Sequence, residues 1–208
     1  MNIDCTIWQC LDKAVKRFNE SDDVGTLLCP RCENPKNKTE KSAAGERAIT
    51  YRLAFYLESE LRGAGLINDV GPLVVDCEYN RHLARGKSLA AEAEERIKKI
   101  VNEARERELK ADDDGYYVFS VAPDIVVHQR RTDINNLLVV EIKKESNTES
   151  EEYDSLKLEL FTKPKHDNRG YGYKFGAKIV AEDEETVRRE LKIVMQYKNG
   201  ERTDLIET

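Results

Sequence analysis

Apolar residues recur at helical and strand spacings along this chain and predict an alternation of helices and strands. Helices are expected where apolar positions repeat every three to four residues, and strands where short β-branched runs lie between turn signals. The predicted helices are residues 3–18, 46–62 and 150–162, and the predicted strands are 72–81, 116–129, 137–144, 173–181 and 191–197. This order predicts a mixed sheet with helices on its faces, which is an α/β fold.

The stretch from residue 84 to 115 interrupts this alternation and is expected to be a helical excursion from the core. A highly charged helix is predicted over 88–110, with Ser88 as its N-cap and a narrow apolar stripe along it. Such a helix is typical of a solvated flank, and its stripe is also narrow enough for a seam with a protein partner. The first 45 residues are expected to form a helix and a loop within one domain spanning 1–208.

Composition narrows the class of protein. Charged residues make up 36% and hydrophobic residues 39% of the 208 residues, which is typical of a foldable globular chain. No apolar run approaches the ~20 residues of a membrane span, and the N-terminus lacks the features of a signal peptide, so a cytoplasmic protein is expected. The formal net charge of −6 counts mildly against tight non-specific DNA binding, but it does not exclude an enzyme with a local basic cleft.

Charged residues stand inside two of the most apolar predicted strands. Asp124 begins one apolar run, and Glu141 and Lys143 flank Ile142 near the end of the next. Because side chains alternate along a strand, Glu141 and Lys143 share one face and Ile142 points to the other. If the two strands form a hairpin, these charges gather at one end of it.

The position of the hairpin turn decides how close the two acids lie. A turn centred on 132 and 133 pairs residues whose numbers sum to 265, and Asp124 then faces Glu141. A turn centred on 135 and 136 would shift the pairing by several residues, although both acids would stay at the same end of neighbouring strands. Facing carboxylates repel unless a divalent cation keeps both ionised. Carboxylates combined with a backbone carbonyl suit Mg²⁺ or Mn²⁺.

A resemblance to the PD-(D/E)xK nuclease superfamily rests on Pro123-Asp124 and Glu141-Ile142-Lys143. It covers residues 46–181 and implies the restriction-endonuclease-like core of that family, with element order αβββαβ. It further implies a Mg²⁺-dependent or Mn²⁺-dependent nuclease that hydrolyses phosphodiester bonds, most often in DNA. The implied metal ligands are Asp124, Glu141, the carbonyl of Ile142, and Glu46 at the start of the first core helix. Lys143 would assist the attacking water or stabilise the transition state.

Other interpretations stay open at this point. The same fold could serve as a non-catalytic module that binds nucleic acid or a protein partner in a larger assembly. Alternatively, a surface hairpin could carry an ordinary ion pair between Lys143 and one of the acids. If the protein cuts both strands of a duplex, a homodimer would supply two copies of one site.

A basic and aromatic stretch from 161 to 178 is the first candidate for contact with nucleic acid, because cations bind phosphates and rings stack on bases. The candidate contacts are Lys163, Lys165, Arg169 and Lys174. The alternative is a loop that leads into a strand and places its aromatic residues in the core. Residues that could line a cleft near the acids are Glu78, Asn80 and His128. Cys29 and Cys32 form a CxxC pair without a matching second pair, so a plain loop is favoured over a zinc site.

Overall fold

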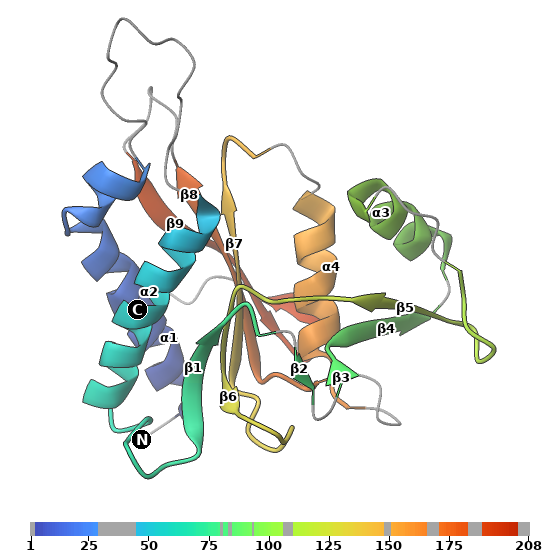
Figure 1. Ribbon diagram of the computed structural model, residues 1–208, viewed down its shortest axis with the longest axis horizontal. Helices are drawn as coiled ribbons and strands as arrows, with labels where there is room; N and C mark the ends of the chain where they lie inside the picture. Colours follow the sequence, from blue (N-terminus) through green and yellow to red (C-terminus); the bar gives the residue numbers. More distant parts are fainter. Residues whose placement is uncertain are drawn as a thin grey trace, which may run out of the picture.

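A six-stranded mixed sheet forms the centre of the molecule, in a computed structural model (Figure 1). The structure describes residues 3–28, 45–79, 81–82, 85–92, 94–105, 110–147, 151–165, 171–182 and 189–203. The strand order is β1-β6-β7-β8-β9-β10, and neighbouring strands are antiparallel except for β7 and β8, which are parallel. Helices α1 and α2 cover one face and α4 covers the other. The predicted mixed α/β arrangement is confirmed.

The elements have the following bounds. The helices are α1 (Ile3–Asn19), α2 (Glu46–Gly63), α3 (Glu95–Arg105) and α4 (Glu151–Thr162), and a π-helical turn, η1, spans Val24–Leu28. The strands of the sheet are β1 (Leu73–Cys77), β6 (Ile125–Gln129), β7 (Leu138–Lys144), β8 (Phe175–Glu182), β9 (Glu190–Lys198) and β10 (Glu201–Thr203). Two separate antiparallel pairs are β2 (Arg81–His82) with β3 (Arg85–Gly86), and β4 (Ser88–Glu92) with β5 (Tyr116–Ser120). None of the described helices is long and apolar enough to cross a membrane.

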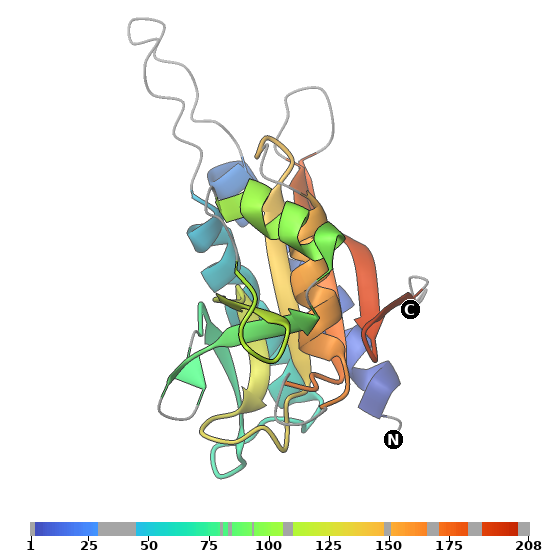
Figure 2. The ribbon, with the colours of Figure 1, turned by 90° about the vertical axis from the view of Figure 1, so that its right-hand side faces the viewer.

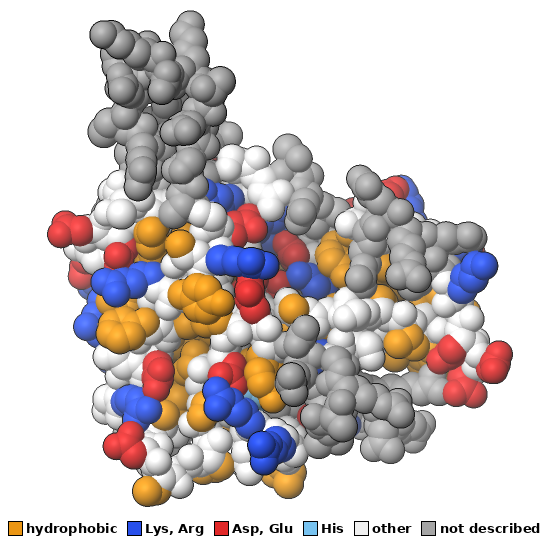
Figure 3. Space-filling view, viewed as in Figure 1, with side chains coloured by type: hydrophobic (Ala, Val, Ile, Leu, Met, Phe, Trp, Pro, Cys, Tyr) orange, Lys and Arg blue, Asp and Glu red, His pale blue; other side chains and the backbone are white. Residues whose placement is uncertain are grey.

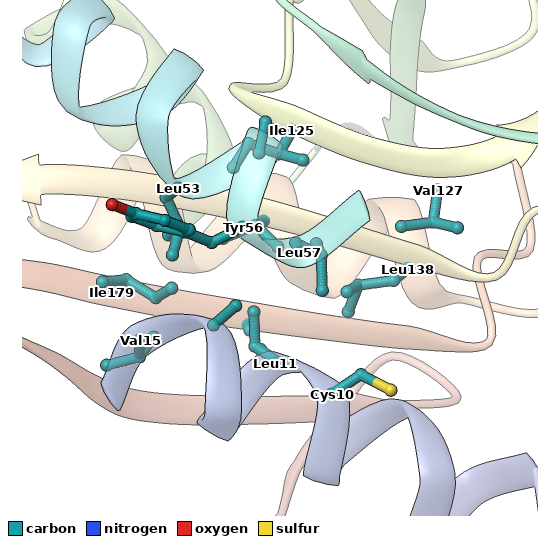
Figure 4. Packing of buried hydrophobic residues seen from close by; sticks show 14 of the residues in the cluster. Cys10, Leu11, Val15, Leu53, Tyr56, Leu57, Ile125, Val127, Leu138 and Ile179 are labelled. Atoms are coloured by element: carbon teal, nitrogen blue, oxygen red, sulfur yellow. The ribbon is translucent and has the colours of Figure 1, made fainter. Parts of the chain in front are cut away.

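The face of the sheet under α1 and α2 is apolar. Val127 of β6 and Leu138 of β7 point to this side and are fully buried. Figure 4 shows Leu57 of α2 pointing toward Leu138, and Leu11 of α1 pointing into the same core from the other helix. Burying each such side chain stabilises the fold by about 1.5–3 kcal/mol. The amphipathic patterns that predicted these two helices therefore face a common core.

The opposite face carries the alternate residues of the same strands. Val126 of β6 and Val139 of β7 pack there in a second apolar cluster, with residues of α3, α4 and the β4–β5 pair. Figure 2 views the molecule from this side, with α3 in front of α4. Asp124 and Glu141 follow the same alternation as these valines. The two acids therefore lie on the α4 side of the sheet.

The prediction of one helix over 88–110 is wrong in its first part. Ser88–Glu92 forms β4, antiparallel to β5, and the described helix α3, Glu95–Arg105, begins after it. Ser88 is not an N-cap, since its backbone N–H donates to the Tyr171 hydroxyl at 2.9 Å. Leu89 and Ala91 are buried while their neighbours Ser88 and Glu92 are exposed, which is the period of a strand. Pairing with the aromatic strand β5 overrode the helical pattern of the sequence.

The apolar stripe predicted for this helix is covered by the chain itself. Ile97, Ile100 and Val101 of α3 are buried in the second apolar cluster. They are therefore not an exposed seam for another molecule. The homodimer and the protein partner stay predictions.

Two predicted strands are shorter than their apolar runs. The run from 116 to 129 gives two strands in different sheets, β5 and β6, with a break that contains Pro123. Proline lacks a backbone N–H and interrupts a ladder. The run from 72 to 81 ends as β1 at Cys77, and Glu78 follows with a φ of 47°. Both breaks lie at the same end of the sheet, because the Glu78 N–H donates to the Asp124 carbonyl at 3.0 Å.

Candidate active site

The last residues of β7 extend beyond the end of its neighbour β6. The final residue pair between these strands involves Ile125 of β6. Beyond that pair, the Ile142 N–H donates to Asp124 Oδ2 at 2.7 Å, and the Lys144 N–H donates to Glu46 Oε1 at 3.1 Å. Two side-chain carboxylates thus replace the missing strand along this edge of β7. Three of the predicted site residues, Asp124, Ile142 and Glu46, meet here.

The predicted register of the β6–β7 hairpin is confirmed. Ile125 pairs with Val140, and the next two pairs keep the same numerical sum of 265. One further step in this register places Asp124 across from Glu141. The charge of Asp124 adds to the elevation of the Glu141 pKa, so the two acids lie near one another.

Glu141 is the most deeply buried acid of this site, with 3% of the residue exposed. Its Oε2 accepts a hydrogen bond from Lys157 Nζ of α4 at 2.6 Å. The same ammonium lies 3.0 Å from Asp154 Oδ1, one turn earlier in the helix. Glu141 Oε1 is buried and has no hydrogen-bond partner among the described residues. An unsatisfied buried carboxylate oxygen is costly and requires an explanation.

Burial raises the pKa of both acids of the site. Burial raises the pKa of Asp124 from 3.8 to about 6, against the opposing effects of the Ile142 N–H and the Lys157 ammonium. Burial also raises the pKa of Glu141, where Lys157 opposes the rise and Asp124 adds to it. Burial lowers the pKa of Lys157, but Glu141 and Asp154 outweigh it and hold that pKa well above its usual range. A divalent cation between the acids would oppose the effect of burial and keep both ionised.

Two more lysines lie under α4. Lys143 follows Glu141 on the same face and is 8% exposed. Lys178 of β8 pairs in register with Glu141, and its Nζ lies 3.3 Å from Glu151 Oε1. Burial lowers the pKa of Lys178; Asp154 and Glu151 oppose this effect and Lys143 adds to it. Cations and anions thus alternate in a buried layer between the sheet and α4.

The donor set suits a cation that keeps part of its shell for water or phosphate. In the described part of the chain, no group of three or more His, Cys, Asp or Glu side chains is arranged to hold a metal ion. Mg²⁺ is commonly bound through one or two carboxylates, with waters and substrate phosphates completing its octahedron. Asp124, Glu141 and the Ile142 carbonyl fit this pattern, and an ion would give Glu141 Oε1 a partner, which it does not have among the described residues.

Glu46 lies close to the acids but already has partners. Its Oε1 accepts from the Lys144 N–H and from Asn147 Nδ2 at 2.9 Å. Its charge adds to the elevation of the Asp124 pKa. The structure therefore places Glu46 beside the site, and its role as a metal ligand stays a prediction.

The candidate cleft residues are separated by the structure. Glu78 adjoins Asp124 through its backbone, and its Oε1 lies 2.7 Å from Arg47 Nε at the start of α2. His128 instead contacts Asp76 Oδ2 at 3.0 Å through Nε2 and packs edge-on against Tyr79. It therefore belongs to a second polar cluster, away from the acids. Asn80 lies outside the described residues, as do Arg169, Cys29 and Cys32.

The described basic candidates lie at the other end of the sheet. Lys163 is 3.0 Å from Glu159, Lys165 is 2.7 Å from Asp133, and Lys174 is 2.6 Å from Asp4. These residues adjoin the end of α4 and the starts of β7 and β8, whereas the acids lie near the end of β7. The two ends of a seven-residue strand such as β7 are about 20 Å apart. The structure does not bring these lysines to the acids.

The aromatic residues of the same stretch belong to the core. Tyr171, Tyr173 and Phe175 are each at most 3% exposed. Of the two interpretations of this stretch, the structure supports the loop and strand with buried rings. Base stacking on these rings is therefore not available.

Sequence reasoning also missed Lys87, which is 2% exposed. Its Nζ donates to the Tyr173 hydroxyl at 2.7 Å and lies within 5.9 Å of the centroids of four rings. The rings are those of Tyr79, Phe161, Tyr171 and Tyr173. Burial lowers the pKa of Lys87 to about 8. This cation fixes the start of β4 against the sheet, and no local sequence pattern indicated it.

The outer face of α2 combines exposed rings with arginines. Tyr51 and Phe55 are 54% and 57% exposed, and the Arg52 guanidinium lies 5.5 Å from the centroid of the Phe55 ring. Arg47 lies one helical turn before Tyr51 on the same face. Figure 3 shows hydrophobic and basic side chains next to one another over this part of the molecule. The start of α2 lies near the acids, because the charge of Glu46 adds to the elevation of the Asp124 pKa, and Tyr51 and Phe55 follow about one and two turns further along the helix.

The chain matches no known family model, no curated protein and no solved structure. The resemblance to PD-(D/E)xK nucleases therefore rests on the two sequence motifs and stays a prediction.

Proposed function

We propose that the protein is a metal-dependent nuclease that hydrolyses phosphodiester bonds in nucleic acid, with DNA as the proposed substrate. The observation that carries the proposal is Glu141, whose buried carboxylate has one oxygen without a described partner and adjoins a second acid, Asp124. A scaffold gains nothing from placing two repelling carboxyls under a helix. A cation site does gain, because a divalent ion keeps both carboxyls ionised.

The arrangement of elements supports a restriction-endonuclease-like core. The order α2, β1, β6, β7, α4, β8 is the αβββαβ order that the sequence motif implies, with β2 to β5 and α3 inserted between β1 and β6. In this order the Pro123-Asp124 motif precedes β6 and the Glu141-Ile142-Lys143 motif lies in β7. Fold alone does not fix function, so the proposal depends on the chemistry of the acids.

Each residue has a distinct role in this proposal. Asp124, Glu141 and the Ile142 carbonyl hold Mg²⁺ or Mn²⁺, and Glu46 stands beside them. Such an ion supplies an activated water and charge neutralisation at the phosphate. Lys143 places a positive charge on the same face, two residues from Glu141, where it can orient the attacking water or stabilise the phosphorane-like transition state.

The nucleic acid approaches over α2 in this proposal. The exposed rings of Tyr51 and Phe55 offer faces for stacking, and Arg47 and Arg52 offer contacts to phosphate. The basic residues near the start of β7 lie too far away to contact the phosphate that is cut. They remain candidates for contact with a distant part of a long substrate.

A non-catalytic module with the same fold is the second candidate. The observation that favours it is the ion pair between Lys157 and Glu141, which gives one acid a cation from the chain itself. In that case the protein binds nucleic acid or a partner without cutting.

A cleavage assay separates the two candidates. Plasmid, single-stranded DNA and RNA are incubated with the protein in Mg²⁺, in Mn²⁺ and in chelator. We expect metal-dependent cutting that is lost in Asp124→Asn and Glu141→Gln, reduced in Lys143→Met and unchanged in Glu145→Gln, an exposed acid of the turn after β7. Retained binding without cutting in any metal would reject the nuclease in favour of the non-catalytic module.

A further inference from the structure

We infer that Lys157 is a positioning residue, which holds Glu141 Oε2 so that Glu141 Oε1 is presented to a single divalent cation. This inference rests on the proposed function, because it concerns how the same site takes up its metal. Lys157 is outside both sequence motifs and comes from α4. It reaches the site because α4 lies over the end of β7.

Three contacts hold the ammonium group of Lys157 in place. Nζ lies 2.6 Å from Glu141 Oε2 and 3.0 Å from Asp154 Oδ1, and the Lys157 side chain is 12% exposed. The Tyr153 ring lies 5.2 Å from the same Nζ and closes one side. A cation held by two carboxylates and a ring has little freedom to move. The carboxylate of Glu141 is therefore held in one orientation.

The two oxygens of Glu141 have different environments as a result. Oε2 is occupied by the ammonium, whereas Oε1 is buried and has no hydrogen-bond partner among the described residues. Continuing the hairpin register one step beyond its last pair, Ile125 with Val140, places Asp124 opposite Glu141. A divalent ion bound by Oε1 and Asp124 would leave the Lys157 contact intact.

The ammonium also occupies the place of a second cation. The position between Glu141 Oε2 and Asp154 would suit a second divalent ion, as in enzymes that use two metals. Lys157 already carries positive charge there, and a like charge close by is unfavourable. The geometry therefore points to one divalent ion for each chain.

The buried Lys178 makes a different contact. Lys178 Nζ is directed to the backbone oxygen and carboxylate of Glu151 at the start of α4. Partners that orient a metal-binding carboxylate typically change metal affinity by about 10–100-fold when they are removed. That range sets the expected size of the effect for Lys157.

Binding of Mn²⁺ to the purified full chain tests the inference without any need for turnover. Free Mn²⁺ is measured by electron paramagnetic resonance during a titration. We expect one Mn²⁺ for each wild-type chain and an affinity weaker by about 10–100-fold in Lys157→Met. Lys157→Arg, which keeps a charged donor, should recover part of the loss. The matched control is Lys163→Met, since Lys163 directly follows the same helix and is paired to Glu159 at 3.0 Å.

Several results would overturn the inference. Equal or tighter Mn²⁺ binding by Lys157→Met would mean that the ammonium is a competitor of the metal or a structural group. Two ions for each wild-type chain would contradict the single site. If circular dichroism shows that Lys157→Met does not fold, Lys157→Gln, which keeps a hydrogen-bond donor, is titrated instead. Mn²⁺ binding by this variant that equals or exceeds that of the wild type would then overturn the inference.

The design separates this inference from the proposed function. If Asp124→Asn abolishes Mn²⁺ binding while Lys157→Met leaves it unchanged, the metal site stands and the role of Lys157 is rejected. If the wild-type chain binds no Mn²⁺, both the metal site and the role of Lys157 are rejected.

Discussion

Replacing Asp124 by asparagine should make the metal-free protein more stable at neutral pH. Burial raises the pKa of this carboxyl from 3.8 to about 6, so the folded state prefers the neutral form. Asparagine is neutral at every pH, and its Oδ1 can accept the Ile142 N–H as Asp124 Oδ2 does at 2.7 Å. The substitution therefore removes a charge penalty and keeps the hydrogen bond.

The size and sign of this effect follow from the pKa difference. A difference of about 2 between the folded and unfolded pKa values corresponds to about 3 kcal/mol. Because the folded pKa is the higher one, the stabilising contribution of Asp124 is complete below about pH 4 and is lost as the pH rises through about 6. Asp124 is only partly buried, so we expect Asp124→Asn to gain about 1–3 kcal/mol at pH 7 and almost nothing at pH 4.

Urea unfolding at a series of pH values in chelator measures this difference. The free energy of unfolding of Asp124→Asn is compared with that of the wild type between pH 4 and pH 8, with Asp113→Asn, in an exposed turn, as the control. A variant that is less stable than the wild type at pH 7 would refute the reasoning. A gain that is the same at every pH would also refute it, because the effect would then not come from ionisation.

Three further predictions concern the core, the buried lysine and the outer face of α2. Leu57→Ala should lower the free energy of unfolding by about 2–5 kcal/mol in urea, because Leu57 is fully buried, whereas Val70→Ala, at a 97% exposed position, should change it little. Tyr173→Phe should cost about 1–3 kcal/mol in the same assay, because it leaves the buried Lys87 ammonium without the hydroxyl 2.7 Å away. Phe55→Ala should weaken binding of a labelled single-stranded oligonucleotide in fluorescence anisotropy by about 1–3 kcal/mol, with Val70→Ala again as the control; unchanged binding would exclude stacking on α2.

The hairpin with the acids could be predicted because its determinants are local. The apolar alternation of β6 and β7 and a turn near 132 fix the register, and that register pairs Ile125 with Val140 as expected. A slip by one residue would turn every apolar side chain of a strand to the wrong face. Strong local patterning therefore located Asp124 and Glu141 without any knowledge of tertiary contacts.

The sequence could not indicate features that depend on contacts between distant elements. Residues 88–92 have a helical pattern, yet they form β4 because β5, more than twenty positions later, offers an aromatic strand to pair with. Lys157 lies 16 positions from Glu141, and only the packing of α4 on β7 makes them an ion pair. The basic stretch after α4 contains suitable residue types for nucleic acid, but the fold places Lys174 at the far end of β7.

The short length of β6 explains why carboxylates lie along the edge of β7 at this site. Because β6 begins at Ile125, which pairs with Val140, it does not reach far enough to pair with the N–H groups of Ile142 and Lys144. Backbone donors at a buried strand edge must be satisfied, and here the carboxylates of Asp124 and Glu46 accept them. Because these two carboxylates take the place of a neighbouring strand, they also concentrate negative charge beside Glu141. In the proposed nuclease, this open edge is where a cation and a phosphate would meet.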